Sequence, residues 1–214
     1  MTDVSVIIRA PSADPVTPRQ WVRRGELLEA ARRVFERDGY HAATVSAIVQ
    51  AAGLSQGAFY LYFPDKKAVF EALQAEMATL LRRRIYWATR DERDPRVRLE
   101  AGLRSYFEFY AEYGDWNRRL LTEGLGIDAG FEARHAELNQ TLVDAFAPTF
   151  AELGISEPAL AGFSLIGMAS QVAYSQRLVP SATPLAPDLL AQACARLFLD
   201  GAATKPTKKG DLHA

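Results

Sequence analysis

Apolar side chains recur at intervals of three and four residues along most of this chain, which is the spacing of one face of an α-helix. Together with capping and helix-breaking residues, the pattern predicts helices over 21–38, 44–52, 55–63, 65–90, about eighteen residues after Pro95, 116–125, 131–153, 157–179 and 188–199. The sequence therefore predicts an all-α protein of about nine helices.

Residues 44–66 predict two short helices joined by a turn. Thr44 is a suitable N-cap for the first helix, and Gly53 supplies the turn residue after it. Ser55 can cap the second helix, which stays short because Pro64 lacks the amide that a further turn needs. Two short helices with a glycine-containing turn between them are typical of a helix-turn-helix.

The second of these helices is expected to show small and phenolic side chains to solvent. Phe59 and Phe63 form its apolar edge, and the 100° step per residue puts Gly57 and Leu61 opposite them. The flanks carry Ala58, Tyr60 and Tyr62. Such a surface can enter a DNA major groove, but a turn between two core helices would have the same spacing. The surrounding sequence has to decide between the two interpretations.

The surrounding residues match a known signature in order and without an insertion from Arg24 to Phe70. The matching positions are Leu27, Leu28, Ala30, Ala31, Phe35, Asp38, Gly39, Tyr40, Thr44, Ile48, Ala52, Gly53, Leu54, Ser55, Gly57, Phe59, Tyr60, Tyr62, Phe63 and Lys66. Together they resemble the N-terminal DNA-binding signature of the TetR family of bacterial transcriptional regulators. Two departures are mild: Val49 stands where the family often has alanine, and Pro64 precedes the cap formed by Asp65 and Lys66.

The resemblance implies a homodimeric transcriptional regulator, a repressor in most members, that binds a palindromic operator. Residues 20–67 would form a three-helix DNA-binding domain, and residues 68–203 would carry dimerisation and the binding of a small-molecule effector of unknown identity. The implied DNA-binding residues are Thr44, Ser55, Gln56, Gly57, Ala58, Tyr60, Leu61, Tyr62 and Lys66. Three of them match family positions that hold phosphates: Thr44, Tyr60 and Lys66. Three others lie where base edges are reached: Gln56, Ala58 and Tyr62.

The larger predicted domain is rich in aromatic residues, which line a cavity as readily as they fill a solid core. Candidates for an effector pocket are Tyr86, Trp87, Phe107, Tyr110, Trp116, Phe146, Phe150, Met168 and Gln171. We expect an apolar or aromatic effector to move the helix over 65–90. This helix would meet the recognition helix through Phe63 and Phe70 and the pocket through Tyr86 and Trp87.

The helix predicted over 157–179 is apolar on two faces and therefore needs two packing partners. An isologous four-helix contact with the last helix of a second copy would cover the second face. The candidate interface residues are Phe163, Ile166, Ser170, Tyr174, Leu190 and Leu197.

The net charge of −1 argues against a wholly basic nucleic-acid coat, so recognition would depend on a few placed contacts. The single cysteine, Cys194, excludes an intrachain disulfide and fits a reducing cytoplasm. The sequence has no signal-peptide pattern and no run of eighteen apolar residues, so we expect a cytoplasmic protein without a membrane segment. Residues 1–19 are expected to form a flexible arm, and residues 204–214 a disordered tail.

An enzyme is the competing class of protein. Glu132 and His135 have the Glu-x-x-His spacing of a di-iron site, but such a site needs a second copy of the motif, and the sequence has none. A solvated helix face explains this pair better. The sequence contains no phosphate loop and no nucleophile elbow, so we expect no catalytic residue, no metal and no cofactor. An architectural DNA-binding protein, or an activator without small-molecule input, is the remaining alternative.

Overall fold

The computed structural model describes residues 17–123, 129–178 and 184–200, and within these ranges the chain folds into helices without strands. The helices are α1 (Pro18–Ala42), α2 (Val45–Ala52), α3 (Gln56–Tyr60), α4 (Lys66–Thr89), α5 (Pro95–Glu112), α6 (Gly114–Glu123), α7 (Ala129–Glu152), α8 (Pro158–Leu178) and α9 (Pro187–Asp200). The all-α prediction is confirmed. The predicted tail and most of the predicted arm lie outside the described residues.

Helix α1 begins earlier and ends later than the sequence pattern indicates. Thr17 caps it and forms a capping box with Gln20, so Pro18 and Arg19 belong to its first turn and not to an arm. Near its other end, Gly39 adopts φ 79° and ψ 168°, which breaks the regular helix before a last turn that ends at Ala42. The predicted end at Gly39 is therefore a kink inside α1.

The caps expected around α2 and α3 are present. The hydroxyl of Thr44 accepts a hydrogen bond from the amide of Ala47 at 3.1 Å, and that of Ser55 accepts one from Ala58 at 3.2 Å. Gly53 ends α2 in the left-handed conformation with φ 66°. Helix α3 is shorter than predicted, because only residues 56–60 are regular α-helix. The three-helix arrangement of α1, α2 and α3 is confirmed.

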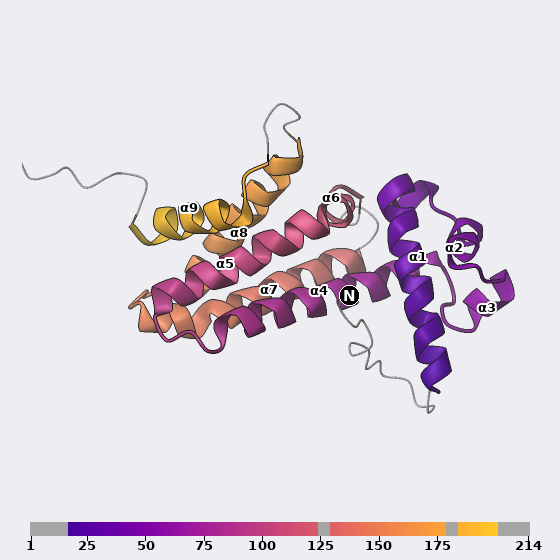
Figure 1. Cartoon of the computed structure of the whole chain (residues 1–214), viewed down its shortest axis with the longest axis horizontal. Coiled ribbons are helices and arrows are strands. Elements are labelled where there is room, and N and C mark those ends of the chain that lie inside the picture. Colours follow the sequence, from indigo (N-terminus) through magenta and orange to yellow (C-terminus); the bar gives the residue numbers. More distant parts are fainter. Residues whose placement is uncertain (1–16, 124–128, 179–183, 201–214) are drawn as a thin grey trace, which may run out of the picture.

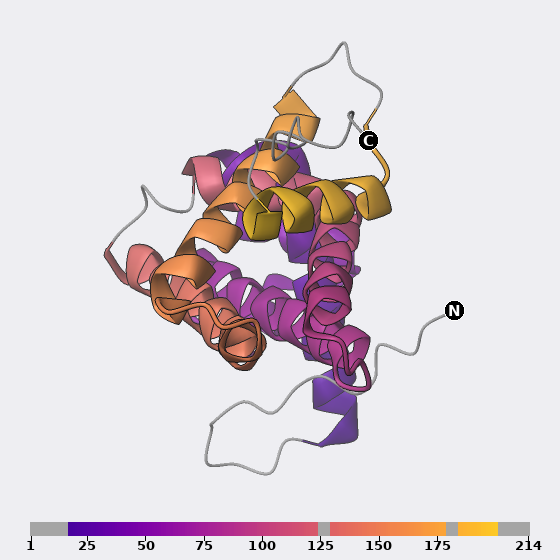
Figure 2. The ribbon, with the colours of Figure 1, turned by 90° about the vertical axis from the view of Figure 1, so that its left-hand side faces the viewer.

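The remaining helices form a larger bundle beside this unit (Figures 1 and 2). Helix α4 packs on α5 and α7, α7 packs on α8, and α5 packs on α9. Close approach depends on two glycines. A Cβ at Gly102 of α5 would lie 2.8 Å from the ring of Phe146, and one at Gly162 of α8 would lie 2.6 Å from Val143. Pro148 lies inside α7, where the sequence predicts a kink or a broken turn, and the helix continues through it to Glu152.

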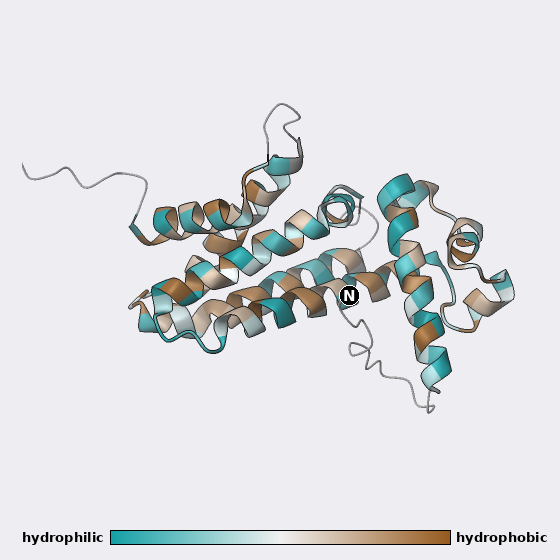
Figure 3. Ribbon diagram, in the orientation of Figure 1, coloured by the Kyte–Doolittle hydropathy of each residue, from teal (hydrophilic) through white to brown (hydrophobic). Residues whose placement is uncertain are grey.

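One apolar core runs through both parts of the molecule. Phe35 of α1, Phe70 of α4, Trp116 of α6 and Phe131 of α7 meet where the parts join, with ring centroids 5.1 Å apart for Phe35 and Phe70 and 5.0 Å apart for Phe70 and Trp116. We call these four residues the junction cluster. Figure 3 shows apolar positions gathered where α4 and α7 face each other. The described helices include none that is long and apolar enough to cross a membrane.

Candidate functional site

Helix α3 lies at one end of the long axis of the molecule, outside α1 and α2 (Figure 1). Phe59 and Phe63 anchor it, with exposed fractions of 0% and 3%. The opposite surface is open, because Leu61 is 81% exposed and Tyr60 is 57% exposed. The fold therefore presents the face of α3 that the sequence analysis singled out.

The other candidates for DNA binding lie on the same end of the molecule. Thr44, Ser55, Gln56 and Gly57 are exposed, while Ala58 and Tyr62 are half-buried. The hydroxyls of Thr44 and Ser55 each accept one backbone amide as a cap, which leaves their own protons free to donate to a further acceptor. These positions lie at the start of α2 and along α3 and its end.

Lys66 differs from this group, because its ammonium is already bonded inside the protein. The Nζ atom donates to the carbonyls of Tyr40 at 2.6 Å, His41 at 3.3 Å and Ala43 at 2.8 Å. It also lies 4.5 Å from the centre of the Tyr40 ring. Burial lowers the pKa of Lys66 from its ordinary value. An ammonium has three protons, so this lysine ties the last turn of α1 to α4 and has no donor to spare for a phosphate.

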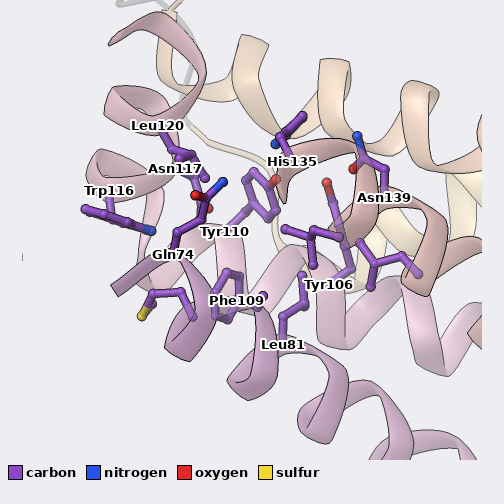
Figure 4. A pocket seen from close by; sticks show the side chains of 14 residues that line it. Gln74, Leu81, Tyr106, Phe109, Tyr110, Trp116, Asn117, Leu120, His135 and Asn139 are labelled. Carbon is purple, nitrogen blue, oxygen red and sulfur yellow. The ribbon is translucent and has the colours of Figure 1, made fainter. Parts of the chain in front are cut away.

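A cavity lies in the larger bundle between α4, α5, α6 and α7 (Figure 4). Its volume is about 20 Å³, which is room for about one water molecule. Its lining is formed by Gln74, Met77, Ala78, Leu81, Tyr106, Phe109, Tyr110, Trp116, Asn117, Leu120, His135, Leu138, Asn139 and Leu142. The cavity is thus a small, mainly apolar space with a few polar groups.

Of the nine residues expected to line a pocket, Tyr110 and Trp116 line this cavity. Phe107, Phe146 and Phe150 fill solid core instead. Met168 is half-buried and Gln171 exposed on α8. Tyr86 and Trp87 lie on the surface, 60% and 55% exposed, so the expected pocket border at this end of α4 is absent from the structure. Helical spacing identifies a face of α4 but does not tell whether that face meets solvent or another helix.

The polar residues of the lining were not predicted from the sequence. Gln74 is 3% exposed and Asn117 is 6% exposed, which is unusual for amide side chains. His135, interpreted from the sequence as part of a solvated face, is half-buried and contributes to the cavity wall. Burial lowers its pKa, so the imidazole is neutral near pH 7. One feature of the sequence indicated a buried amide: Gln74 lies between the apolar residues Leu73 and Met77 of the same helix.

Helix α6 connects the cavity with the end of α1. Trp116, Asn117 and Leu120 line the cavity. From the same helix, Arg119 donates to the carbonyls of Glu36 at 3.4 Å and Arg37 at 3.3 Å, and Glu123 accepts the amide of Tyr40 at 2.7 Å. Arg119 and Glu123 also pair with each other. We call Arg119 and Glu123 the α6 clasp, because they bond the backbone on both sides of the Gly39 kink.

The candidate interface residues divide into two groups. Phe163 and Leu197 are exposed, 47% and 45%, as a docking face requires. Ile166 and Leu190 are 4% and 8% exposed and belong to the core of their own chain, so they are not available to a partner. The hydroxyl of Ser170 bonds that of Tyr106 at 2.8 Å, and Tyr174 is half-buried. Leu160 of α8 and Leu189 of α9, 65% and 55% exposed, extend the open apolar face and were missed.

The described residues contain no group of three His, Cys, Asp or Glu side chains that could hold a metal ion. Cys194 is a free thiol, buried in α9, and burial raises its pKa. A thiol with a raised pKa in an apolar site is a poor nucleophile, so Cys194 serves packing and not reaction.

Comparison with known proteins identifies the α1–α3 unit. Residues 27–73 match the family model described as "Bacterial regulatory proteins, tetR family". The chain is 36% identical to the HTH-type transcriptional activator FasR of Mycolicibacterium smegmatis, over 47% of this chain and 46% of that protein. It is 34% identical to the HTH-type transcriptional repressor AcnR of Corynebacterium diphtheriae, over 58% of this chain and 61% of that protein. The chain thus spans about half the length of these relatives, which are regulators and not enzymes.

Solved structures show that the likeness of fold extends beyond the matched segment. The fatty acid degradation regulator FadR from Bacillus halodurans superposes with a TM-score of 0.75 over 86% of this chain and 97% of that chain, at 20% identity. FadR from Bacillus subtilis, solved in complex with stearoyl-CoA, gives a TM-score of 0.75 over 84% and 99%, at 17% identity. The α1–α3 unit, the helical bundle behind it and the matched sequence segment lead to one conclusion: the chain carries the DNA-binding segment of the TetR family of bacterial regulators, and its fold is that of solved TetR-like regulators.

Proposed function

We propose that this protein regulates transcription by binding duplex DNA through α2 and α3. The observation that carries the proposal is the open surface of α3, where Tyr60 and Leu61 are exposed while Phe59 and Phe63 hold the helix in place. The relatives FasR and AcnR are named as transcriptional regulators, which supports the same role here. Such a role places the protein in the cytoplasm, where bacterial DNA is found.

Within this surface we assign two kinds of contact. Gln56, Ala58 and Tyr62 face base edges, because a glutamine amide can bond adenine and a small side chain lets the helix approach the groove floor. Thr44 and Tyr60 donate hydroxyl protons to phosphates. Ser55, Gly57 and Leu61 complete the contact surface. Lys66 supports this surface indirectly, since its bonds to Tyr40, His41 and Ala43 fix α4 against α1.

We propose that two copies bind a palindromic operator together. The exposed apolar side chains of α8 and α9 would pack in a two-fold, four-helix contact, which needs close approach of the two α8 helices. The surface around Gly167 permits this, because a Cβ at that position would meet no described atom within 4 Å. Two α3 helices would then read half-sites about one helical turn, or a multiple of it, apart.

The cavity is the proposed effector site, and two elements connect it to the DNA-binding unit. Gln74 and Met77 of α4 lie on its wall, one and two turns from Phe70, which packs on Phe35 of α1. Helix α6 supplies Trp116 to the wall and its clasp to the end of α1. An effector that prefers the DNA-incompetent state by ~1 to 3 kcal/mol would lower DNA affinity ~5 to 150 fold.

We propose repression as the mode of regulation, with release by the effector, by analogy with AcnR, which is named a repressor. FasR is named an activator, so activation is the second candidate. The stearoyl-CoA held by FadR of Bacillus subtilis is not carried over to this protein. The described cavity has no lysine or arginine in its lining for the phosphates of coenzyme A.

The test compares three proteins on duplexes recovered from a random pool. Gln56→Ala removes an exposed amide on α3, and Gln140→Ala removes an exposed amide on α7, in the bundle. We expect Gln56→Ala to relax the preference at particular base pairs by about 1 to 3 kcal/mol each, measured by fluorescence anisotropy. Gln140→Ala should bind like the wild type. The α3 assignment is rejected if Gln56→Ala keeps the full base preference.

A further inference from the structure

Three buried polar atoms that have no hydrogen-bond partner among the described residues line the cavity between α4, α5, α6 and α7. They are Nε2 of Gln74, Nε1 of Trp116 and Nδ1 of His135. Burial without a partner destabilises a polar group, so native proteins rarely retain one without a reason. In Figure 4, Trp116, Gln74 and Asn117 lie together at one end of the cavity, Asn139 lies at the other end, and His135 lies between them. The unpaired groups thus share one space.

Two of these atoms can only donate a hydrogen bond. The indole nitrogen of Trp116 is a donor and never an acceptor. The amide of Gln74 is held in one orientation, because its oxygen accepts from Nε of Arg134 at 3.4 Å and its nitrogen therefore faces away from Arg134. Arg134 is in turn paired with Glu71 at 2.7 Å. A molecule that satisfies Trp116 and Gln74 must bring an acceptor.

The remaining polar groups of the wall are paired within the protein or neutral. The amide nitrogen of Asn117 donates to the carbonyl of Tyr113 at 3.1 Å, and the hydroxyl of Tyr106 pairs with Ser170. His135 is uncharged near pH 7, because burial lowers its pKa. Among the described residues of the lining, none carries a charge at that pH. A buried carboxylate would find no cation here, and burial of an unpaired charge is far more costly than burial of a neutral carbonyl.

From these contacts we infer that the cavity binds an uncharged, largely apolar molecule, with an aromatic or similarly flat body, whose carbonyl oxygen accepts from Trp116 and Gln74. The rings of Tyr106, Phe109 and Tyr110 and the side chains of Met77 and Leu81 supply the apolar walls for its body. The inference rests on the proposed function, since it assumes that the cavity is the effector site.

The small size of the cavity links binding to regulation. A space of about 20 Å³ is small for a molecule of this class, so we expect binding to displace the helices around it. Trp116 is part of that wall and of the junction cluster, with its ring centroid 5.0 Å from Phe70 and 6.5 Å from Phe35. A ligand carbonyl bonded to its indole nitrogen would therefore act on the contact between the bundle and α1.

Three probes of nearly equal shape separate the possible ligand classes. Acetophenone has a neutral carbonyl, α-methylstyrene has a methylene in place of the carbonyl oxygen, and benzoate has a carboxylate. Binding to the full-length protein without DNA is followed by the indole N–H signals in ¹H–¹⁵N spectra, and the signal of Trp116 is assigned by its loss in Trp116→Phe. We expect acetophenone to shift that signal downfield and to bind about tenfold more tightly than α-methylstyrene, as two satisfied donors require.

Two variants test whether the side chains of Trp116 and Gln74 cause the preference for acetophenone over α-methylstyrene. Trp116→Phe keeps an aromatic wall without the donor, and Gln74→Met removes the second donor while keeping a flexible side chain of similar length, so one variant remains informative if the other misfolds. Each should reduce the ratio of the two affinities toward one, while Trp87→Phe, on the exposed end of α4, should leave it unchanged.

Equal affinities for acetophenone and α-methylstyrene in the wild type, or tighter binding of benzoate, would overturn the inference. If no probe binds, the inference falls together with the effector part of the proposed function. The DNA-binding part would stand, because the Gln56→Ala comparison tests it without any ligand.

Discussion

Gly39 lies where the end of α1 meets Glu123 and Arg119 of α6. Its φ of 79° and ψ of 168° lie in a region that is essentially restricted to glycine. A Cβ at this position would also lie 2.6 Å from Oε2 of Glu123, the atom that accepts the amide of Tyr40. Both the backbone conformation and the α6 clasp therefore require a residue without a side chain.

Replacement of Gly39 by alanine should lower the free energy of unfolding by about 1 to 3 kcal/mol because of backbone strain. The displacement of Glu123 should lower it further. Gly25→Ala is the matched control, because Gly25 lies within α1 and a Cβ there meets no described atom within 4 Å. Its expected effect is a stabilisation of about 0.5 to 1 kcal/mol. Urea unfolding measures the free energy of unfolding of both variants. Equal values for Gly39→Ala and Gly25→Ala would show that the conformation of Gly39 is not strained by a side chain.

At the residue scale, the features that depend only on neighbouring residues in the sequence were predicted correctly. The caps of Thr44, Ser55 and Asp65 depend on amides three residues away, and all three are present. Lys66 was assigned to phosphate binding through family resemblance, but its partners are carbonyls 23 to 26 positions earlier in the chain. Such contacts depend on how α4 is placed against α1, which no local pattern specifies.

At the scale of elements, α6 is the helix whose role was not anticipated. From the sequence, we expected α4 alone to connect the pocket with the DNA-binding unit. The structure keeps α4 in that position, through Gln74 and Phe70, and adds α6, whose two faces contact the cavity and the end of α1. Periodicity shows that a helix has an apolar face, but Arg119 and Glu123 look like ordinary surface residues until their partners are known.

Glu123→Ala tests the clasp. The amide of Tyr40 would lose its carboxylate acceptor in a part-buried site, and a hydrogen bond to a charged group contributes about 1.5 to 3 kcal/mol. Hydrogen exchange at Tyr40 should become at least about tenfold faster, because the local opening free energy falls by that amount. Thr122→Ala on the same helix is the control, since the Thr122 hydroxyl is exposed and bonds only within α6. Unchanged exchange at Tyr40 in Glu123→Ala would contradict the role of the clasp.

At the scale of the whole molecule, the open apolar face of α8 and α9 predicts a dimer. Ile166 is buried in its own chain, so a charged residue there would unfold the protein and would not report on the interface. Gly167→Leu tests the interface more directly. Within one protomer a Cβ at this position meets no described atom within 4 Å, but in a dimer the leucine side chain would hold the two α8 helices apart.

Sedimentation at micromolar concentration should show a wild-type dimer and a Gly167→Leu monomer. Gly25→Leu introduces the same side chain at another open helical glycine and should leave the dimer intact. A Gly167→Leu protein that sediments as a dimer as stable as the wild type would exclude the α8 face as the interface.

The number and order of the helices were predicted from the sequence. The residues that line the cavity of the bundle were mostly not. Nine segments with helical spacing correspond to the nine described helices, and the helix-turn-helix was found from its caps and its turn glycine. The cavity was placed near Tyr86 and Trp87, yet it lies nearer the DNA-binding unit, beside Trp116. Which aromatic residues fill core and which border a space depends on helix packing, including the close approach at Gly102.

The most direct test of the central claim is selection of bound sequences by the wild-type protein from a random duplex DNA pool. If two copies bind through α3, the recovered sequences should contain an inverted repeat with half-site centres about 10 base pairs, or a multiple of that spacing, apart. Recovery of sequences no different from the starting pool would contradict the claim that this surface reads DNA, and enrichment of a single half-site without a repeat would contradict the two-fold dimer.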